Sequence, residues 1–349
     1  MANNHMGDLN HGIRVIKEFA SVCKEFPYSF AFKLQYRDLD TFVHPSMKGR
    51  TDLKYIKRFE ETRLSRADFD YLIEAIRDNG FIAMSTPFDE ASVLLIDEQD
   101  LDIIKVASCS FSDWPLLERI VKSDKPIIAS TAGATLEKID QVITFFQHRK
   151  KDFAIMHCVG EYPTPEENMN LSQIDLLSSR YPDVRIGYST HENPGNTKLV
   201  QLAVAKGASV FEKHVGVATE NFPLNKYSCS PEQLASWLQA FTYAIRVCGE
   251  GVKRPPVNDK EQNNLKSLRR GAFARQEILL GEQIKLEDVY FAFPPQEGQY
   301  TANDWSKYSN VSCTKAIKAN QAIHPGNCKI SNTRSQVLQI VQQVKMDNH

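Results

Sequence analysis

The chain has 349 residues, 42% of them hydrophobic, and its 42 Lys and Arg nearly balance 43 Asp and Glu, for a formal net charge of −1. This length suffices for one large core and a second small one, and the balanced charge with no basic stripe argues against a nucleic-acid partner. No run approaches the roughly 18 apolar residues of a membrane helix, and seven scattered Cys without C-x-x-C spacing favour reduced thiols in a cytoplasm over disulfides or a zinc site.

Short apolar, β-prone runs alternate with segments of helical period from residue 30 to residue 215. A helical segment at 11–26 comes before the first of these runs. The predicted strands are 31–36, 81–88, 103–108, 126–131, 154–159, 185–190 and 209–215. Predicted helices between them include 64–79, 113–123, 135–150, 170–181 and 196–207. The strands are almost continuously hydrophobic, which is typical of parallel strands covered on both faces.

This alternation predicts an α/β fold, and the number of units favours a TIM-type (β/α)8 barrel. A barrel needs eight strands, and the helix at 11–26 should follow one of them. We therefore expect the body of a first strand upstream of Met1, with its end in "MANNHMGDLN". The alternative is a doubly wound open sheet, which would need a Gly-rich phosphate loop after its first strand, and none is found.

The character of the sequence changes near residue 250. The stretch 251–266 is polar and contains Pro, which is typical of a linker, whereas "GAFARQEILLGEQI" and "SCTKAIKANQAI" indicate short strands. We predict a barrel domain at 1–250, a linker at 251–266, a small β-rich domain at 267–334 and a tail at 335–349. The tail is either a short helix or a frayed end.

Polar side chains gather where the predicted strands end, and in a parallel barrel all these ends open onto one face. A single His at a strand end is usually a hydrogen-bonded loop residue. His191 and His214, however, end consecutive strands, and imidazole nitrogen suits Mn, Fe, Co or Zn. Lys33 and Lys105 lie within apolar runs, where a cation is costly unless an anion pairs with it. The pattern therefore predicts a metal site beside a pocket for a phosphate or carboxylate.

Eight motifs occur in order along the chain: "NNHMGD", "KLQ", "STPFD", "KVASCS", "IIASTAG", "HCVGEYPTP", "GYSTH" and "FEKHV". Together they resemble the successive motifs of the sialic acid synthase (NeuB) family. The likeness runs from residue 3 to about residue 240, and more weakly into a C-terminal module similar to the family's antifreeze-like (SAF) domain. Members of this family condense phosphoenolpyruvate with an N-acylated hexosamine to form a nine-carbon ulosonic acid.

The resemblance implies a divalent metal, Mn or Mg, on His191 and His214, and a catalytic role for these two residues and Lys105. It implies a cytoplasmic homodimer in which the SAF domain of one subunit covers the barrel mouth of the other. The positions that match those of phosphoenolpyruvate binding are Lys33, Thr86, Lys105, Ser108, Ser130 and Ser189. Those that match positions near the sugar are Gln35, Tyr162 and Asn225.

The chain departs from the family pattern at several acidic or basic positions. The Glu of the family's first strand would fall just before Met1. Other charged family residues are replaced by Ser110, Thr190, Asn225 and Phe293. We therefore expect a variant sugar acceptor that lacks the usual N-acyl group. Glu161 is a candidate replacement carboxylate, although a solvated loop acid is the more ordinary interpretation of this residue.

Two other functions are compatible with the sequence. One is a metal-dependent aldolase or lyase that acts on a phosphorylated sugar with the same barrel. The other is an inactive homologue that binds a sugar or phosphate and has lost the catalytic acids. Phosphate release from phosphoenolpyruvate on addition of a hexosamine separates the synthase from the aldolase or lyase. An in-frame strand ending in Glu upstream of Met1 would favour an enzyme over the inactive homologue.

Overall fold

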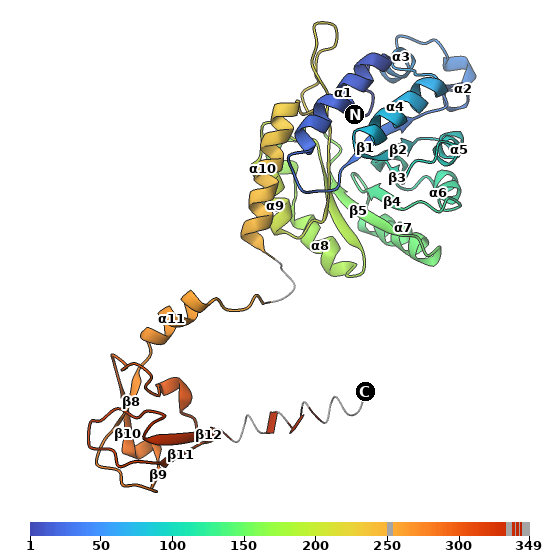
Figure 1. Cartoon of the computed structure of the whole chain (residues 1–349). Helices are drawn as coiled ribbons and strands as arrows, with labels where there is room; N and C mark the ends of the chain where they lie inside the picture. The colour runs from blue at the N-terminus through green and yellow to red at the C-terminus, as the bar shows by residue number, and fades with distance from the viewer. Residues whose placement is uncertain (250–253, 333–336, 339, 342, 344–349) are drawn as a thin grey trace. The chain divides into compact units, whose positions relative to one another are not determined.

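The structure is a computed structural model that describes residues 1–249, 254–332, 337, 338, 340, 341 and 343 (Figure 1). The chain divides into two compact units, Met1–Gly251 and Val252–His349. Among the described residues, no helix combines the length and the apolar character that crossing a membrane requires.

The first unit is built on one parallel sheet whose seven strands follow one another in sequence order. This arrangement confirms the predicted α/β fold of the TIM-barrel type. The observed strands lie within two residues of the predicted ends. They are β1 (Ala31–Tyr36), β2 (Ile82–Pro87), β3 (Ile103–Val106), β4 (Ile127–Ser130), β5 (Phe153–Cys158), β6 (Arg185–Thr190) and β7 (Val210–Lys213).

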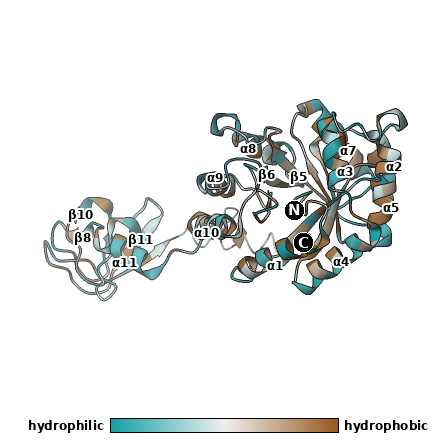
Figure 2. Cartoon of the chain, turned by 90° about the horizontal axis from the view of Figure 1, so that it is seen from above, coloured by the Kyte–Doolittle hydropathy of each residue, from teal (hydrophilic) through white to brown (hydrophobic). Residues whose placement is uncertain are grey.

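Helices surround this sheet, and Figure 2 shows both hydrophilic and hydrophobic residues on them. The helices of the first unit are α1 (Leu9–Cys23), α2 (Leu39–Phe42), α3 (Lys54–Glu61), α4 (Arg66–Asp78), α5 (Glu90–Glu98), α6 (Trp114–Ile120), α7 (Leu136–His148), α8 (Ser172–Arg180), α9 (Lys198–Ala205) and α10 (Pro231–Cys248). Ser65 begins α4 with a capping box to Asp68, which satisfies free N–H groups at the helix start.

The packing of the core explains why the strand sequences are almost continuously apolar. Leu34, Ile104 and Ile155 are fully buried on three different strands, with helices packed over their outer face. Each such side chain contributes about 1.5–3 kcal/mol through its removal from water. Lys105 is only 2% exposed and lies between Ile104 and Val106, so it is held on the opposite side of β3 from them.

The two edge strands of the sheet are β1 and β7. A cavity of about 690 Å³ is lined by residues of both strands and of α10, including Phe32, Phe211 and Trp237. An eighth strand of a closed barrel would lie between these two edges. The strand expected upstream of Met1 stays a prediction.

Among its described residues, the second unit contains short antiparallel strands, the helix α11 (Asp259–Ser267), two 3-10 helices and helical residues between 337 and 343. Helix α11 lies mostly within the stretch predicted as a linker. Two small sheets have the orders β10–β8 and β12–β11–β9. Their strands are β8 (Gly271–Ala274), β9 (Gln283–Ile284), β10 (Val289–Ala292), β11 (Ser309–Cys313) and β12 (Cys328–Asn332). The predicted tail lies largely outside the described residues.

Candidate functional site

A small cavity of about 80 Å³ lies where the strands of the first unit end. Every strand from β1 to β7 contributes a residue to it, either from its last positions or from the residues directly after it. The cavity therefore gathers side chains that are up to about 180 positions apart in the sequence, as the barrel topology predicts. The lining residues are Lys33, Gln35, Thr86, Lys105, Ala107, Ser108, Ser130, Cys158, Tyr162, Ser189, His191, Glu212 and His214.

Two ammonium groups enter this cavity from β1 and β3. The Nζ of Lys33 lies 2.5 Å from Oε2 of Glu212, and the two side chains are 16% and 20% exposed. The Nζ of Lys105 donates to the carbonyl oxygen of Val106 at 3.0 Å and to Oγ of Ser130. Burial lowers the pKa of Lys105 to about 8, and the neighbouring Lys33 acts in the same direction. Lys105 has a third N–H, which is available to an anion in the cavity.

Glu212 is a carboxylate in the cavity that the sequence reasoning did not single out. Its Oε1 accepts a hydrogen bond of 2.9 Å from Oγ of Ser189. Burial disfavours its charged form, but Lys105 and Lys33 outweigh burial and hold the pKa of this carboxyl below its ordinary range. Glu212 is therefore ionised at neutral pH. A signal was present in the sequence, because Glu212 is two residues before His214 in "FEKHV" and so belongs to the same face of β7.

Hydroxyl groups line the rest of the wall. Oγ of Ser108 accepts from the backbone N–H of Ala132 at 3.1 Å. Oγ1 of Thr86 is shielded from solvent and has no hydrogen-bond partner among the described residues. Because a buried hydroxyl without a partner costs about 1–3 kcal/mol, a polar ligand that bonds to Thr86 would remove this penalty.

The two imidazoles face each other across the cavity, with ring centroids 5.5 Å apart. Nδ1 of His191 lies 3.2 Å from the carbonyl oxygen of Val159, so this nitrogen carries the proton and Nε2 keeps its lone pair. Nδ1 of His214 is shielded from solvent and has no hydrogen-bond partner among the residues that the structure describes. Burial lowers the pKa of His191 to about 4 and that of His214 well below its ordinary value, so both rings are neutral.

Two neutral imidazoles are suitable donors for one divalent ion, since nitrogen–metal bonds measure about 2.0–2.1 Å and the ring spacing leaves room between them. The unpartnered Nδ1 of His214 is the observation that fits a ligand here. Within the described parts of the chain, no cluster of three or more His, Cys, Asp or Glu could hold a metal. A metal at this place would thus have only two side-chain ligands, and its other positions would be open to substrate and water.

Gln35 and Tyr162, which the resemblance places near the sugar, also line the cavity. The Tyr162 ring packs against His191 with centroids 4.4 Å apart. Asn225 is not among the lining residues. Its Nδ2 donates to Oδ1 of Asn4 at 3.3 Å and its Oδ1 accepts from the backbone N–H of Tyr227, so its amide is engaged in holding loops together.

The positions where the chain departs from the family pattern do not supply a new acid to the cavity. Glu161 is exposed and accepts hydrogen bonds of 3.0 and 3.2 Å from Asn168, as a solvated loop acid does. Ser110 and Thr190 are buried, and Oγ1 of Thr190 has no hydrogen-bond partner in the residues that are described. Glu212 is the only carboxylate among the lining residues that the structure describes.

Comparison with known proteins gives one family assignment. A model of the NeuB family matches residues 30–253, which includes β1 to β7. N,N'-diacetyllegionaminic acid synthase of Campylobacter jejuni is 28% identical over 289 residues, covering 80% of this chain and 84% of the relative. Human N-acetylneuraminate-9-phosphate synthase is 26% identical over 260 residues, covering 73% and 71% of the two chains.

Two solved structures are also similar to this chain. A chain from Chromobacterium violaceum, assigned as spore coat polysaccharide biosynthesis protein E, is 51% identical with a TM-score of 0.91, covering 94% of this chain and 98% of that chain. A sialic acid synthetase from Leptospira borgpetersenii, solved with citrate, is 28% identical with a TM-score of 0.67, covering 76% and 88%.

Proposed function

The chain belongs to the NeuB family and is a carbon–carbon bond-forming transferase of the N-acetylneuraminate synthase type; from this premise we propose that it condenses phosphoenolpyruvate with a hexosamine or related sugar. The products are a nonulosonic acid and inorganic phosphate. One observation carries the proposal: a single cavity is lined by all the predicted site residues except Asn225.

The charges of the cavity support phosphoenolpyruvate as one substrate. Lys33 and Lys105 provide two cations against the single carboxylate of Glu212, so the empty pocket has an excess of positive charge. An anionic substrate removes the cost of this excess. The hydroxyls of Thr86, Ser108 and Ser130 are suitable donors to phosphate or carboxylate oxygens.

The reaction makes two bonds, one carbon–carbon and one carbon–oxygen, and breaks the carbon–oxygen bond to phosphate. Carbon 3 of the enol phosphate attacks the aldehyde carbon of the open-chain sugar, and the aldehyde oxygen takes up a proton. Water then adds at carbon 2, and the carbon–oxygen bond to phosphate breaks. Glu212 is held ionised between Lys33 and Lys105, so we assign it to orient that water by accepting a hydrogen bond from it, while the departing phosphate takes the proton. The two lysines stabilise the departing phosphate.

We assign a divalent metal, Mn or Mg, to His191 and His214. When bound, such an ion supplies Lewis-acid polarisation of the sugar aldehyde. The chain's own contribution is to keep both imidazoles neutral, through burial, and to fix the ring of His191 through its hydrogen bond to Val159. The Tyr162 ring against His191 closes one side of the aldehyde position to water.

We propose further that the enzyme is a cytoplasmic homodimer with a variant acceptor. All seven cysteines are unpaired in the structure, which suits a reducing compartment. The second unit exposes Leu279, Leu280 and Phe293, apolar side chains suited to contact with the barrel of a partner. Light scattering on the purified chain tests the dimer, and a monomer at micromolar concentration would contradict it.

The experiment for the catalytic proposal is a screen of hexoses and hexosamines with phosphoenolpyruvate and Mn²⁺, read as inorganic phosphate and as product mass. Lys105→Met and Glu212→Gln remove one charge each from the cavity. Arg149→Gln, which breaks an exposed ion pair with Glu118, is the matched surface control. We expect sugar-dependent phosphate release in wild type and control, and its loss in the two cavity variants. Cleavage of a phosphorylated sugar without phosphoenolpyruvate would instead indicate an aldolase or lyase.

A further inference from the structure

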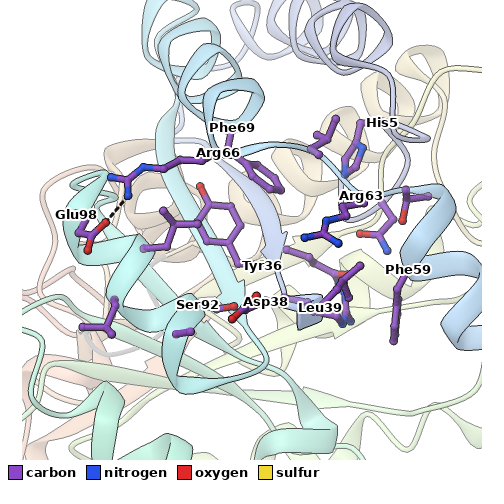
Figure 3. Close-up of a pocket in the computed structure, with 18 residues that line it drawn as sticks. His5, Tyr36, Asp38, Leu39, Phe59, Arg63, Arg66, Phe69, Ser92 and Glu98 are labelled. Carbon is purple, nitrogen blue, oxygen red and sulfur yellow. Dashed lines mark hydrogen bonds and ion pairs between the residues drawn. The ribbon is translucent and has the colours of Figure 1, made fainter. Parts of the chain in front are cut away.

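A second and larger cavity, of about 410 Å³, lies beside the first at the end of β1. Figure 3 shows its walls, with Arg66 and Glu98 joined on one side and His5, Arg63 and Phe59 on the other. The side chain of Gln35 lines both cavities. The two spaces therefore meet at one residue of β1, and nothing in the proposed reaction uses the larger one.

The larger cavity contains an arginine, Arg37, with an unusual environment. Its guanidinium carbon lies 3.5 Å from the ring centroid of Phe88 and 4.2 Å from that of Phe59, so the group is stacked between two rings. Of its five N–H groups, one donates to Oε1 of Gln35 at 3.3 Å. Its Nε is shielded from solvent and has no hydrogen-bond partner in the described part of the chain. The stacking fixes the plane of the guanidinium and leaves its edge available for a ligand.

The other arginines of this cavity are neutralised. Arg63 pairs with Asp40 at 2.7 Å and Arg66 pairs with Glu98 at 2.6 Å. Among the described lining residues, Arg37 is the only arginine without a carboxylate partner. Burial lowers its pKa to about 10, while the nearby Cys109 and Asp89 oppose this shift, so the group stays charged at neutral pH.

The nearest carboxylates are engaged elsewhere. Asp89 accepts from the backbone N–H groups of Ser92 and Asp38 at 2.7 and 2.9 Å. Asp38, which also lines the cavity, accepts from the Thr41 hydroxyl at 2.8 Å and from the backbone N–H of Asp40. Both acids thus cap the starts of α5 and α2 instead of pairing with Arg37. A partly desolvated guanidinium with these neighbours favours the binding of an oxyanion from a ligand.

The position of Arg37 relative to the first cavity suggests what carries that oxyanion. Lys33 and Gln35 share one face of β1 and are separated by about 6.6 Å along the strand. Arg37 directly follows the last residue of β1 and donates a hydrogen bond to Gln35. An open-chain hexose with its aldehyde near the two histidines can extend past Gln35 toward Arg37. The larger cavity then receives the end of the acceptor remote from the aldehyde.

We propose that the acceptor sugar carries an oxyanion, a phosphate or a carboxylate, at the end remote from its aldehyde, and that Arg37 binds this group. This inference rests on the proposed function, since it names the class of acceptor for the same site. Arg37 is a specificity-determining residue here and takes no part in forming the new bond.

The first test measures binding without turnover. Calorimetry on the full chain compares mannose, its 6-phosphate and mannuronic acid, for wild type, Arg37→Met and Arg66→Met. Methionine fills the space between two rings without a charge, and Arg66→Met removes a guanidinium from the same cavity that Glu98 already neutralises. We expect wild type and Arg66→Met to bind at least one anionic sugar about tenfold or more tightly than the neutral one, and Arg37→Met to lose this preference. The two anionic sugars distinguish phosphate from carboxylate.

The second test measures turnover of the same acceptors as consumption of phosphoenolpyruvate. In wild type, we expect kcat/KM for the anionic acceptor to exceed that for the neutral acceptor about tenfold or more. In Arg37→Met, we expect the two values of kcat/KM to be nearly equal. Equal kcat/KM for all acceptors in wild type would overturn the proposal while leaving the proposed function intact, and so would a preference that survives in Arg37→Met. Arg37-dependent binding of an anionic sugar without consumption of phosphoenolpyruvate would refute the proposed function and keep the subsite. No binding and no turnover would refute both.

Discussion

The buried ion pair between Glu192 and Lys213 gives the strongest prediction. Oε1 of Glu192 lies 2.7 Å from Nζ of Lys213, and the two side chains are 1% and 4% exposed. Glu192 follows His191 directly, and Lys213 directly precedes His214. The pair thus joins the ends of β6 and β7 and fixes the two imidazoles relative to each other.

The size of the effect follows from this burial. At 2.7 Å and an effective dielectric constant of about 20, the attraction is about 6 kcal/mol, and most of it is offset by the loss of hydration of both groups. Removal of one partner leaves the other charge buried alone, at a cost of about 3–5 kcal/mol. Oε2 of Glu192 already has no hydrogen-bond partner within the described ranges of the chain, so no group there can replace Lys213.

Glu192→Met and Lys213→Met should each lower the free energy of unfolding by about 3–5 kcal/mol, or the Tm by roughly 6–20 °C. The double variant should be more stable than either single one, because it leaves no bare charge. Each single variant should also weaken Mn²⁺ binding about 10–100-fold, because the imidazoles lose their support. Chemical denaturation and calorimetry measure the two effects.

The exposed pair between Arg66 and Glu98 provides the control. It is as short as the buried pair, but its side chains are 60% and 53% exposed, so Glu98→Gln should cost less than about 1 kcal/mol. The reasoning is refuted if Glu192→Met is equally mild, or if the two buried substitutions simply add in the double variant.

Three further predictions concern the site and the sheet. Lys105→Met should lower kcat/KM for phosphoenolpyruvate by about tenfold or more. Because the ammonium of Lys105 has a pKa of about 8 in the free enzyme, wild-type kcat/KM should be constant below pH 8 and fall above it. Lys105→Arg should shift this fall to higher pH, and a fall at the same pH in both proteins would contradict the assignment. His191→Ala should weaken Mn²⁺ binding at least about tenfold in calorimetry. An unchanged Kd would show that His191 and His214 do not form the metal site. Gly187→Ala should lower the free energy of unfolding by about 1–3 kcal/mol or more in chemical denaturation. The reason is that the Cβ of the new alanine would lie 2.4 Å from the carbonyl oxygen of Val210 in the next strand. A stability equal to that of wild type would contradict this close packing.

The strands of the barrel were predictable because each is covered on both faces and therefore must be apolar along its whole length. Helices with a clear apolar stripe, such as 64–79 and 135–150, were predictable for the related reason that one side packs on the sheet. The short helices α2 and α3 were not predicted, because α2 has only four residues and α3 buries none of its residues.

The site was predictable to the extent that strand ends must converge in a parallel barrel. Lys105 stood out in an apolar run, and the two histidines stood out as ends of consecutive strands. Glu212 did not stand out, since a carboxylate beside a lysine in "FEKHV" is equally expected on a surface. The amide of Asn225 forms contacts with Asn4, more than 200 residues away, which no local pattern reports.

The sequence by itself determined the alternation of strands and helices, the edge of the sheet where the chemistry lies, and the excess of cations there. These properties follow from burial and from chain direction, which local patterns record. Only the tertiary structure decided which charges meet: Glu212 with Lys33, Glu192 with Lys213, and Arg37 with two aromatic rings and no carboxylate. The physical reason is that an ion pair depends on a separation of a few ångströms between strands, and that separation is fixed by packing across the whole barrel.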